Sequence, residues 1–216
     1  MPSPVTPLRR ALALAVGLLA AAGAAADLAV AVRSAQGEPV ADAVVALVPL
    51  DRPAPPPAGA AGEIVQQHEE FTTYVTVVQA GTRVVFPNRD TVQHHVYSLS
   101  KAKRFELPLY NPGQAESFVF DVSGTVTLGC NIHDWMLAYL VVVPTPHFAK
   151  TDAQGAAQVA APAGRYRLEL WHPRLGAAVT QEVALTGAAP LTREFSLTLK
   201  PDRRIRRGGA GKSGGY

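Results

Sequence analysis

The chain has 216 residues, of which 48% are hydrophobic and 17% are charged, and its formal net charge is +3. The basic excess lies at the two ends, and the body between them is mildly acidic, so we exclude nucleic acid as a partner. A single cysteine, Cys130, excludes an intramolecular disulfide and a cysteine-rich zinc site.

Residues 1–26 are typical of a secretory signal peptide. Arg9 and Arg10 supply the positive charge at its start, and residues 11–22 form the apolar segment. The small residues 24–26 precede the cleavage site. The alternative is an uncleaved membrane anchor, but the apolar run is short for a span of roughly 20 residues. We expect cleavage near Ala26, a periplasmic or secreted protein, and no transmembrane span in the mature chain.

The rest of the chain indicates an all-β fold. Helical periodicity is absent, and runs of Val, Thr, Tyr and Phe recur between Gly, Pro and Asn turns. Short strands at this spacing are typical of β-sandwiches and barrels. The predicted strands cover 28–33, 40–48, 74–78, 83–86, 95–99, 104–107, 116–121, 124–128, 137–143, 157–160, 166–172, 178–184 and 193–199.

Two breaks in composition divide this pattern. Residues 51–63 are rich in Pro, Ala and Gly, which predicts a stiff linker and not a central strand. A shorter break follows at 144–146, and the segment 64–143 contains every candidate metal ligand. Residues 200–216 form a basic, Gly-rich tail that we expect to be disordered. That tail would make at most a weak contact with an acidic partner or an anionic membrane surface.

The lone cysteine opens the sequence CNIHDWM at 130–136, which places a thiolate, an imidazole and a thioether close together. A second source of imidazole, the pair His94 and His95, lies upstream. Two His, one Cys and a weak axial Met are the set that favours copper in electron-transfer sites. The alternative is that Cys130 is a buried, inert thiol.

These two motifs resemble the ligand segments of the blue copper cupredoxins, the Greek-key β-sandwich family that includes plastocyanin and amicyanin. The Cys-x-x-His-x-x-Met spacing is similar to the short amicyanin loop, and FPNRDTVQH at 86–94 is similar to the upstream segment. The resemblance covers about 80 residues and implies one type 1 copper ion. The implied ligands are His94, Cys130, His133 and the axial Met136.

The chain departs from the family around these ligands. The family usually has Asn after the first His, where this chain has His95, so the link that the Asn makes between the two ligand segments is in doubt. A one-residue shift of the strand would turn His95 toward the metal, which makes it the alternative first ligand. Asn88 and Ile132 are expected to support the ligands. The Ile132 N–H would donate to the Cys130 sulfur and raise the reduction potential.

The flanking segments, 27–50 and 144–199, resemble the two halves of a carboxypeptidase regulatory-like (transthyretin-like) β-sandwich. The motifs are Gly-x-Pro-Val-x-x-Ala from residue 37, Thr-Asp-x-x-Gly from 151 and Pro-x-Gly-x-Tyr from 162. The resemblance implies a copper domain at 64–143 inserted into a discontinuous host domain. The alternative is two consecutive domains, with 28–50 as an extra strand pair of the first.

The resemblance implies an exported one-electron carrier. Its partners would be redox proteins such as c-type cytochromes or a dehydrogenase, with electrons leaving by the edge of His133 near Trp135. We do not expect an enzyme, because the copper enzymes of this family need additional copper sites and the sequence has no second complete His cluster. Two alternatives stay open: copper storage or delivery, and a structural or adhesion β-sandwich without a working metal site.

Overall fold

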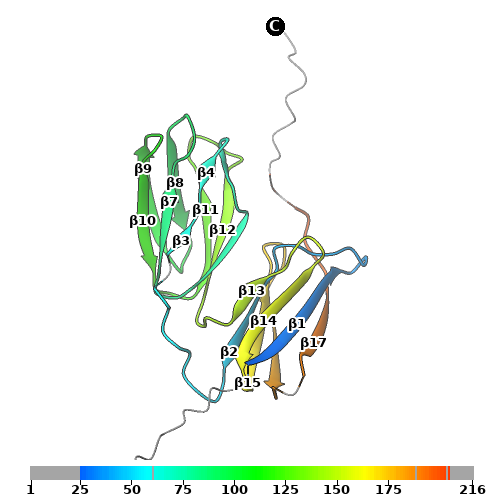
Figure 1. Cartoon of the computed structure of the whole chain (residues 1–216). Helices are drawn as coiled ribbons and strands as arrows, with labels where there is room; N and C mark the ends of the chain where they lie inside the picture. The colour runs from blue at the N-terminus through cyan, green and yellow to red at the C-terminus, as the bar shows by residue number, and fades with distance from the viewer. Residues whose placement is uncertain (1–24, 60, 188, 203, 205–216) are drawn as a thin grey trace, which may run out of the picture.

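The structure, a computed structural model, describes residues 25–59, 61–187, 189–202 and 204 (Figure 1). These residues form 17 strands and no helix, which confirms the all-β prediction. None of them belongs to a helix that is long and apolar enough to cross a membrane. Most of the predicted signal peptide and of the basic tail lies outside the described residues. Strand β1 begins at Ala25, two residues before the expected mature N-terminus at Asp27.

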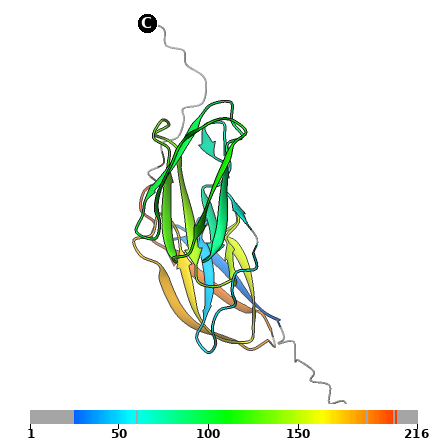
Figure 2. The same ribbon diagram turned by 90° about the vertical axis from the view of Figure 1, so that its left-hand side faces the viewer.

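Residues 62–143 form one β-sandwich, here called the central domain. One sheet has the strand order β10-β7-β3, the other has the order β6-β12-β11-β8-β9, and β4 and β5 form a separate hairpin. Figure 2 shows this domain stacked end to end on the rest of the protein. The strands are β3 (Gly62–Glu63), β4 (Gln66–Gln67), β5 (Glu70–Phe71), β6 (Val75–Gln79), β7 (Thr82–Pro87), β8 (His94–Leu99), β9 (Arg104–Tyr110), β10 (Ala115–Phe120), β11 (Gly124–Gly129) and β12 (Leu137–Val143).

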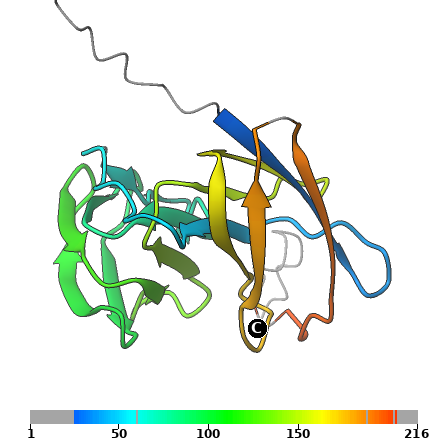
Figure 3. The ribbon, with the colours of Figure 1, turned by 90° about the horizontal axis from the view of Figure 1, so that it is seen from below.

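The segments on either side of the central domain fold together into a second sandwich, here called the outer domain (Figures 1 and 3). Its sheets have the orders β14-β1-β17 and β13-β2-β15-β16. Within the described strands, β1 and β2 pair only with strands that follow residue 147. The strands are β1 (Ala25–Ser34), β2 (Val44–Pro49), β13 (Phe148–Lys150), β14 (Ala156–Pro162), β15 (Gly164–Trp171), β16 (Val179–Leu185) and β17 (Leu191–Leu197).

Two residues of the outer domain join its distant segments. Thr151 is 2% exposed, and its hydroxyl accepts the Ala43 N–H at 2.9 Å and donates to the Val40 carbonyl at 2.8 Å. Gly155 has a φ of +75°, and a Cβ at this position would lie 2.3 Å from the Val32 carbonyl oxygen. Both contacts span the insertion of the central domain, so they tie the start of the chain to its second half.

The two domains touch through a small apolar cluster. Strand β2 contributes Val44 and Ala46, and the central domain contributes Val75, Val141 and Val143. Because these side chains are buried between the sandwiches, they fix the domains against each other. At the edge of this cluster, the Arg204 guanidinium lies 4.0 Å from the centre of the Tyr74 ring, so the start of the basic tail packs on the central domain.

The elements differ from prediction at their ends and in four short strands. Strand β3 pairs in parallel with β7, so pairing in the central domain begins at residue 62, inside the predicted linker 51–63. Strand β2 begins at Val44 and not at residue 40, because Asp42 has a φ of +62° and lies in a turn. Strands β3, β4, β5 and β13 were not predicted, since two or three residues are too few to show alternation.

Candidate metal centre

Strand alternation brings the candidate ligands into the same interior. On β11, Val126 and Leu128 are fully buried, and the same period of two carries Cys130 inward to 4% exposure. Strand β8 begins with His94, which is 0% exposed and lies on the same face as the buried Val96. The thiol and the first imidazole are therefore oriented by neighbouring strands of one sheet, independently of any bound ion.

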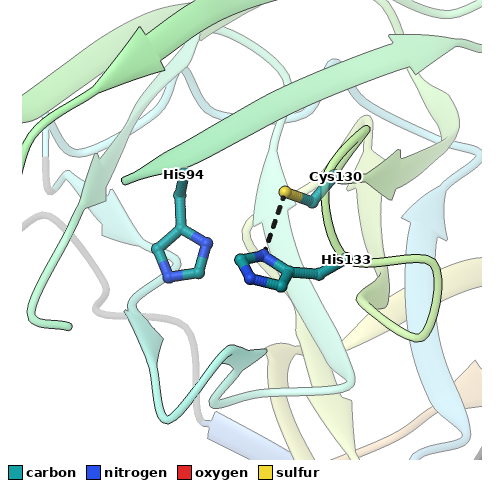
Figure 4. Close-up of side chains that lie close together, drawn as sticks. All are labelled: His94, Cys130 and His133. Atoms are coloured by element: carbon teal, nitrogen blue, oxygen red, sulfur yellow. Dashed lines mark hydrogen bonds between the residues drawn. The ribbon is translucent and has the colours of Figure 1, made fainter. Parts of the chain in front are cut away.

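His94, Cys130 and His133 point toward one another (Figure 4). One ligand atom from each lies within 4.8 Å of the others. Cys130 Sγ is 3.6 Å from His133 Nδ1, and the two imidazole centroids are 5.0 Å apart. A metal ion in the plane of three ligands, with bonds of about 2.0–2.3 Å, separates its ligand atoms by about 3.5–3.8 Å. The group therefore needs only a small contraction to bind one.

The two nitrogens of His94 have different surroundings. Nε2 lies 3.1 Å from Asp90 Oδ2, whereas Nδ1 is buried and has no hydrogen-bond partner among the described residues. An unpaired buried polar atom is costly and calls for an explanation. A metal ion shared with Cys130 and His133 would satisfy this nitrogen. The donor set of two imidazoles and one thiolate therefore fits copper.

His95, the alternative first ligand, lies apart from this group. Its Nε2 is 2.9 Å from Glu106 Oε1, and its ring packs 5.6 Å from Tyr97. The pairing of β8 with β9 is irregular between His94 and Val96. The extra residue of this irregularity lies on β9, so β8 keeps its alternation and His95 is on the face opposite His94, with Tyr97. His95 is buried there beside Glu106 and Tyr97.

The carboxylate of Asp90 is held in its ionised form. Burial alone would raise the pKa of Asp90, but the N–H groups of Glu69 and Thr91 and the His94 ring hydrogen-bond to it and lower the pKa below its ordinary value. The Glu69 N–H and His94 Nε2 share the same oxygen, Oδ2. The negative charge of Asp90 therefore lies beside Nε2, at the edge of the His94 ring that is turned away from Cys130.

The downstream loop is fixed by the β4–β5 hairpin. The Trp135 indole N–H donates to the Glu69 carbonyl at 2.8 Å, and His133 Nε2 lies 3.8 Å from Glu69 Oε2. The His133 side chain is 12% exposed. Trp135, which lies beside the expected electron exit at His133, is partly buried against the core and held by this hydrogen bond.

The remaining predicted residues surround the group. Met136 is 3% exposed and belongs to the same core cluster as Cys130, and its N–H donates to the His133 carbonyl at 3.0 Å. Asn88 is 1% exposed, and its amide donates to the carbonyls of Val92 and Tyr110. It thus shapes the turn that leads into His94. Ile132 is 49% exposed at the tip of the loop.

Comparison with known proteins bears on the fold. No protein-family model matches the chain, and no curated protein matches it. Its structural neighbours are cupredoxins. A purple cupredoxin from Nitrosopumilus maritimus is 22% identical, with 38% of this chain and 98% of the neighbour covered and a TM-score of 0.35.

Two further neighbours resemble the chain to a similar degree. A mutant of amicyanin in its Cu(I) state is 22% identical over 45% of this chain and 97% of its own, with a TM-score of 0.36. A Cu-containing nitrite reductase from Thermus scotoductus SA-01 is 20% identical over 44% of this chain and 25% of its own, with a TM-score of 0.37. The β-sandwich assignment and the metal assignment both rest on the strand pairing and the geometry described above.

Sequence reasoning missed two residues of the centre. Asp90 was quoted as part of the upstream motif but was given no role, although its position four residues before His94 is a usable signal. Glu69 carried no signal, because only the folded hairpin brings it to the ligand loops.

Proposed function

We propose that this chain is an exported type 1 copper protein that carries single electrons between redox partners. Bound copper would supply a one-electron couple, and His94, Cys130 and His133, with the buried Met136, are the residues that would hold it. The observation that carries the proposal is the buried, unpartnered Nδ1 of His94, which is aimed at a thiol and a second imidazole. Such a preformed, buried group favours fast electron transfer, because little has to move when the charge of the ion changes.

The surroundings also favour a carrier over a storage or delivery protein. Delivery needs an exchangeable metal in an open site, whereas His94 and Cys130 are 0% and 4% exposed. We propose no enzymatic activity, since the described residues bring together one group of three ligands and copper enzymes of this type use more. Partners such as c-type cytochromes or a dehydrogenase would dock near His133, where the preceding residue Ile132 has an exposed apolar side chain.

The test is the visible spectrum of the purified mature protein after addition of Cu(II). We expect an intense thiolate-to-copper charge-transfer band that is lost in Cys130→Ser and in His94→Gln. The matched control is His95→Gln, which changes an equally buried neighbour and should keep the band. Loss of the band in His95→Gln with retention in His94→Gln would reverse the ligand assignment. A pale spectrum with readily lost copper in the unmodified protein would favour copper delivery.

A further inference from the structure

Each of the two imidazoles has a carboxylate beside its Nε2. Asp90 Oδ2 lies 3.1 Å from His94 Nε2, within hydrogen-bond distance. Glu69 Oε2 lies 3.8 Å from His133 Nε2, which is too long for a hydrogen bond but places the carboxylate beside the ring. Nδ1 of His133 faces the Cys130 thiol, and Nδ1 of His94 is buried with no hydrogen-bond partner among the described residues. Both rings are therefore placed between a carboxylate and the candidate metal position.

One residue connects these two pairs. The Glu69 N–H donates to Asp90 Oδ2, and the Glu69 carbonyl accepts the Trp135 indole N–H. The backbone of Glu69 thus bridges the segment that carries His94 and the loop that carries His133.

The turn of the β4–β5 hairpin is left-handed at both of its central residues. His68 and Glu69 have φ values of +58° and +56°, a left-handed conformation that side chains other than Gly rarely adopt. They are two of the three non-glycine residues with positive φ in the described chain, and they are adjacent. Positive φ at both central residues is the ordinary geometry of a two-residue hairpin turn, and here it closes the β4–β5 hairpin, in which Gln67 pairs with Glu70. The turn is also tied to Asp90 and to Trp135 through the Glu69 backbone.

We infer that Asp90 and Glu69 are positioning residues that hold the two imidazole ligands and lower the reduction potential of the copper. This inference rests on the proposed function. A carboxylate that accepts from the far nitrogen of a ligating imidazole fixes the ring orientation and makes the near nitrogen a stronger donor. Two negative charges close to the ion also stabilise Cu(II) more than Cu(I). Both effects act in the same direction, toward the oxidised state.

The experiment measures the reduction potential of the copper-loaded protein and of charge-neutral variants. Loss of a hydrogen-bonding partner of a ligand typically costs 10–100-fold in metal affinity. We expect Asp90→Asn to reduce the preference for Cu(II) over Cu(I) about tenfold, which raises the potential of a one-electron couple by about 59 mV. Glu69→Gln should raise it by less, because its carboxylate is farther from the ring and its side chain is 31% exposed.

Glu70→Gln is the matched control, since it removes the same charge from the next, exposed residue. The inference would be overturned if Asp90→Asn and Glu69→Gln both had the same reduction potential as Glu70→Gln. If Asp90→Asn does not fold, the comparison of Glu69→Gln with Glu70→Gln decides alone. The visible band of the unmodified protein reports separately on the proposed function.

A second readout does not depend on copper. In the apoprotein, nitrogen-15 NMR of the His94 ring reports which nitrogen carries the proton. We expect the proton on Nε2, facing Asp90, and a changed Nε2 resonance in Asp90→Asn but not in Glu70→Gln. A proton on Nδ1 in the unmodified apoprotein would contradict the positioning role, whatever the spectrum of the copper form shows.

Discussion

Replacing Thr151 by Val tests whether the outer domain is built from two distant segments. The Thr151 hydroxyl is the buried link between β13 and the segment before β2, through the Ala43 N–H and the Val40 carbonyl. Val has nearly the same shape but no hydroxyl, so both backbone groups lose their partner. Each orphaned buried group costs about 1–3 kcal/mol, and the pair therefore costs about 2–6 kcal/mol. For a domain of this size, even 2 kcal/mol lowers the Tm by about 8–16 °C.

Calorimetry and urea unfolding of the copper-loaded protein measure this loss. We expect the unfolding transition of the outer domain to move to lower temperature. The charge-transfer band should persist until the central domain itself unfolds. Thr192→Val is the control, because Thr192 is exposed on β17 and its substitution leaves no buried group unpaired. A loss below about 0.5 kcal/mol in Thr151→Val would refute the reasoning, since that is the range of neutral surface substitutions.

Two further predictions concern a glycine and an acidic residue. Gly155→Ala should cost more than about 2 kcal/mol in urea unfolding, because it combines a left-handed φ with a clash against the Val32 carbonyl. Gly37→Ala, at a similar φ in open space, should cost less, and equal losses would show that the clash does not matter. The hydrogen bond from Arg204 lowers the pKa of Asp202 to about 2, so its stabilisation is complete above the ordinary pKa of about 3.9 and is lost as the pH falls toward 2. Asp202→Asn should remove this part of the acid dependence of the unfolding free energy, and identical pH profiles of the two proteins would contradict the prediction.

Some of the fold and the site could be predicted because they follow from local alternation. The period of two that buries Val126 and Leu128 also carries Cys130 inward, and it is visible in the sequence. The choice between His94 and His95 could not be made in this way, because both are buried, and the contacts of His95 with Glu106 and Tyr97 leave no signal in the sequence pattern. Glu69 reaches the ligands only through a hairpin of two-residue strands, which leaves no periodic pattern.

The pairing of β1 has a consequence for the order in which the protein folds. Leu28 pairs with Val159 on one side and with Leu191 on the other, whereas every strand pair of the central domain lies between residues 62 and 143. During synthesis, every strand of the central domain is available for pairing before β14 and β17 have been made. During refolding, these strands can pair before β14 and β17 have come back to β1. Strands β1 and β2 therefore stay unpaired until the strands after residue 147 reach them. Their pairing closes a loop that contains the whole central domain, and closing so long a loop is slow. The ligand group can therefore assemble in a molecule whose other half is still unfolded, and the slow refolding phase should belong to the outer domain.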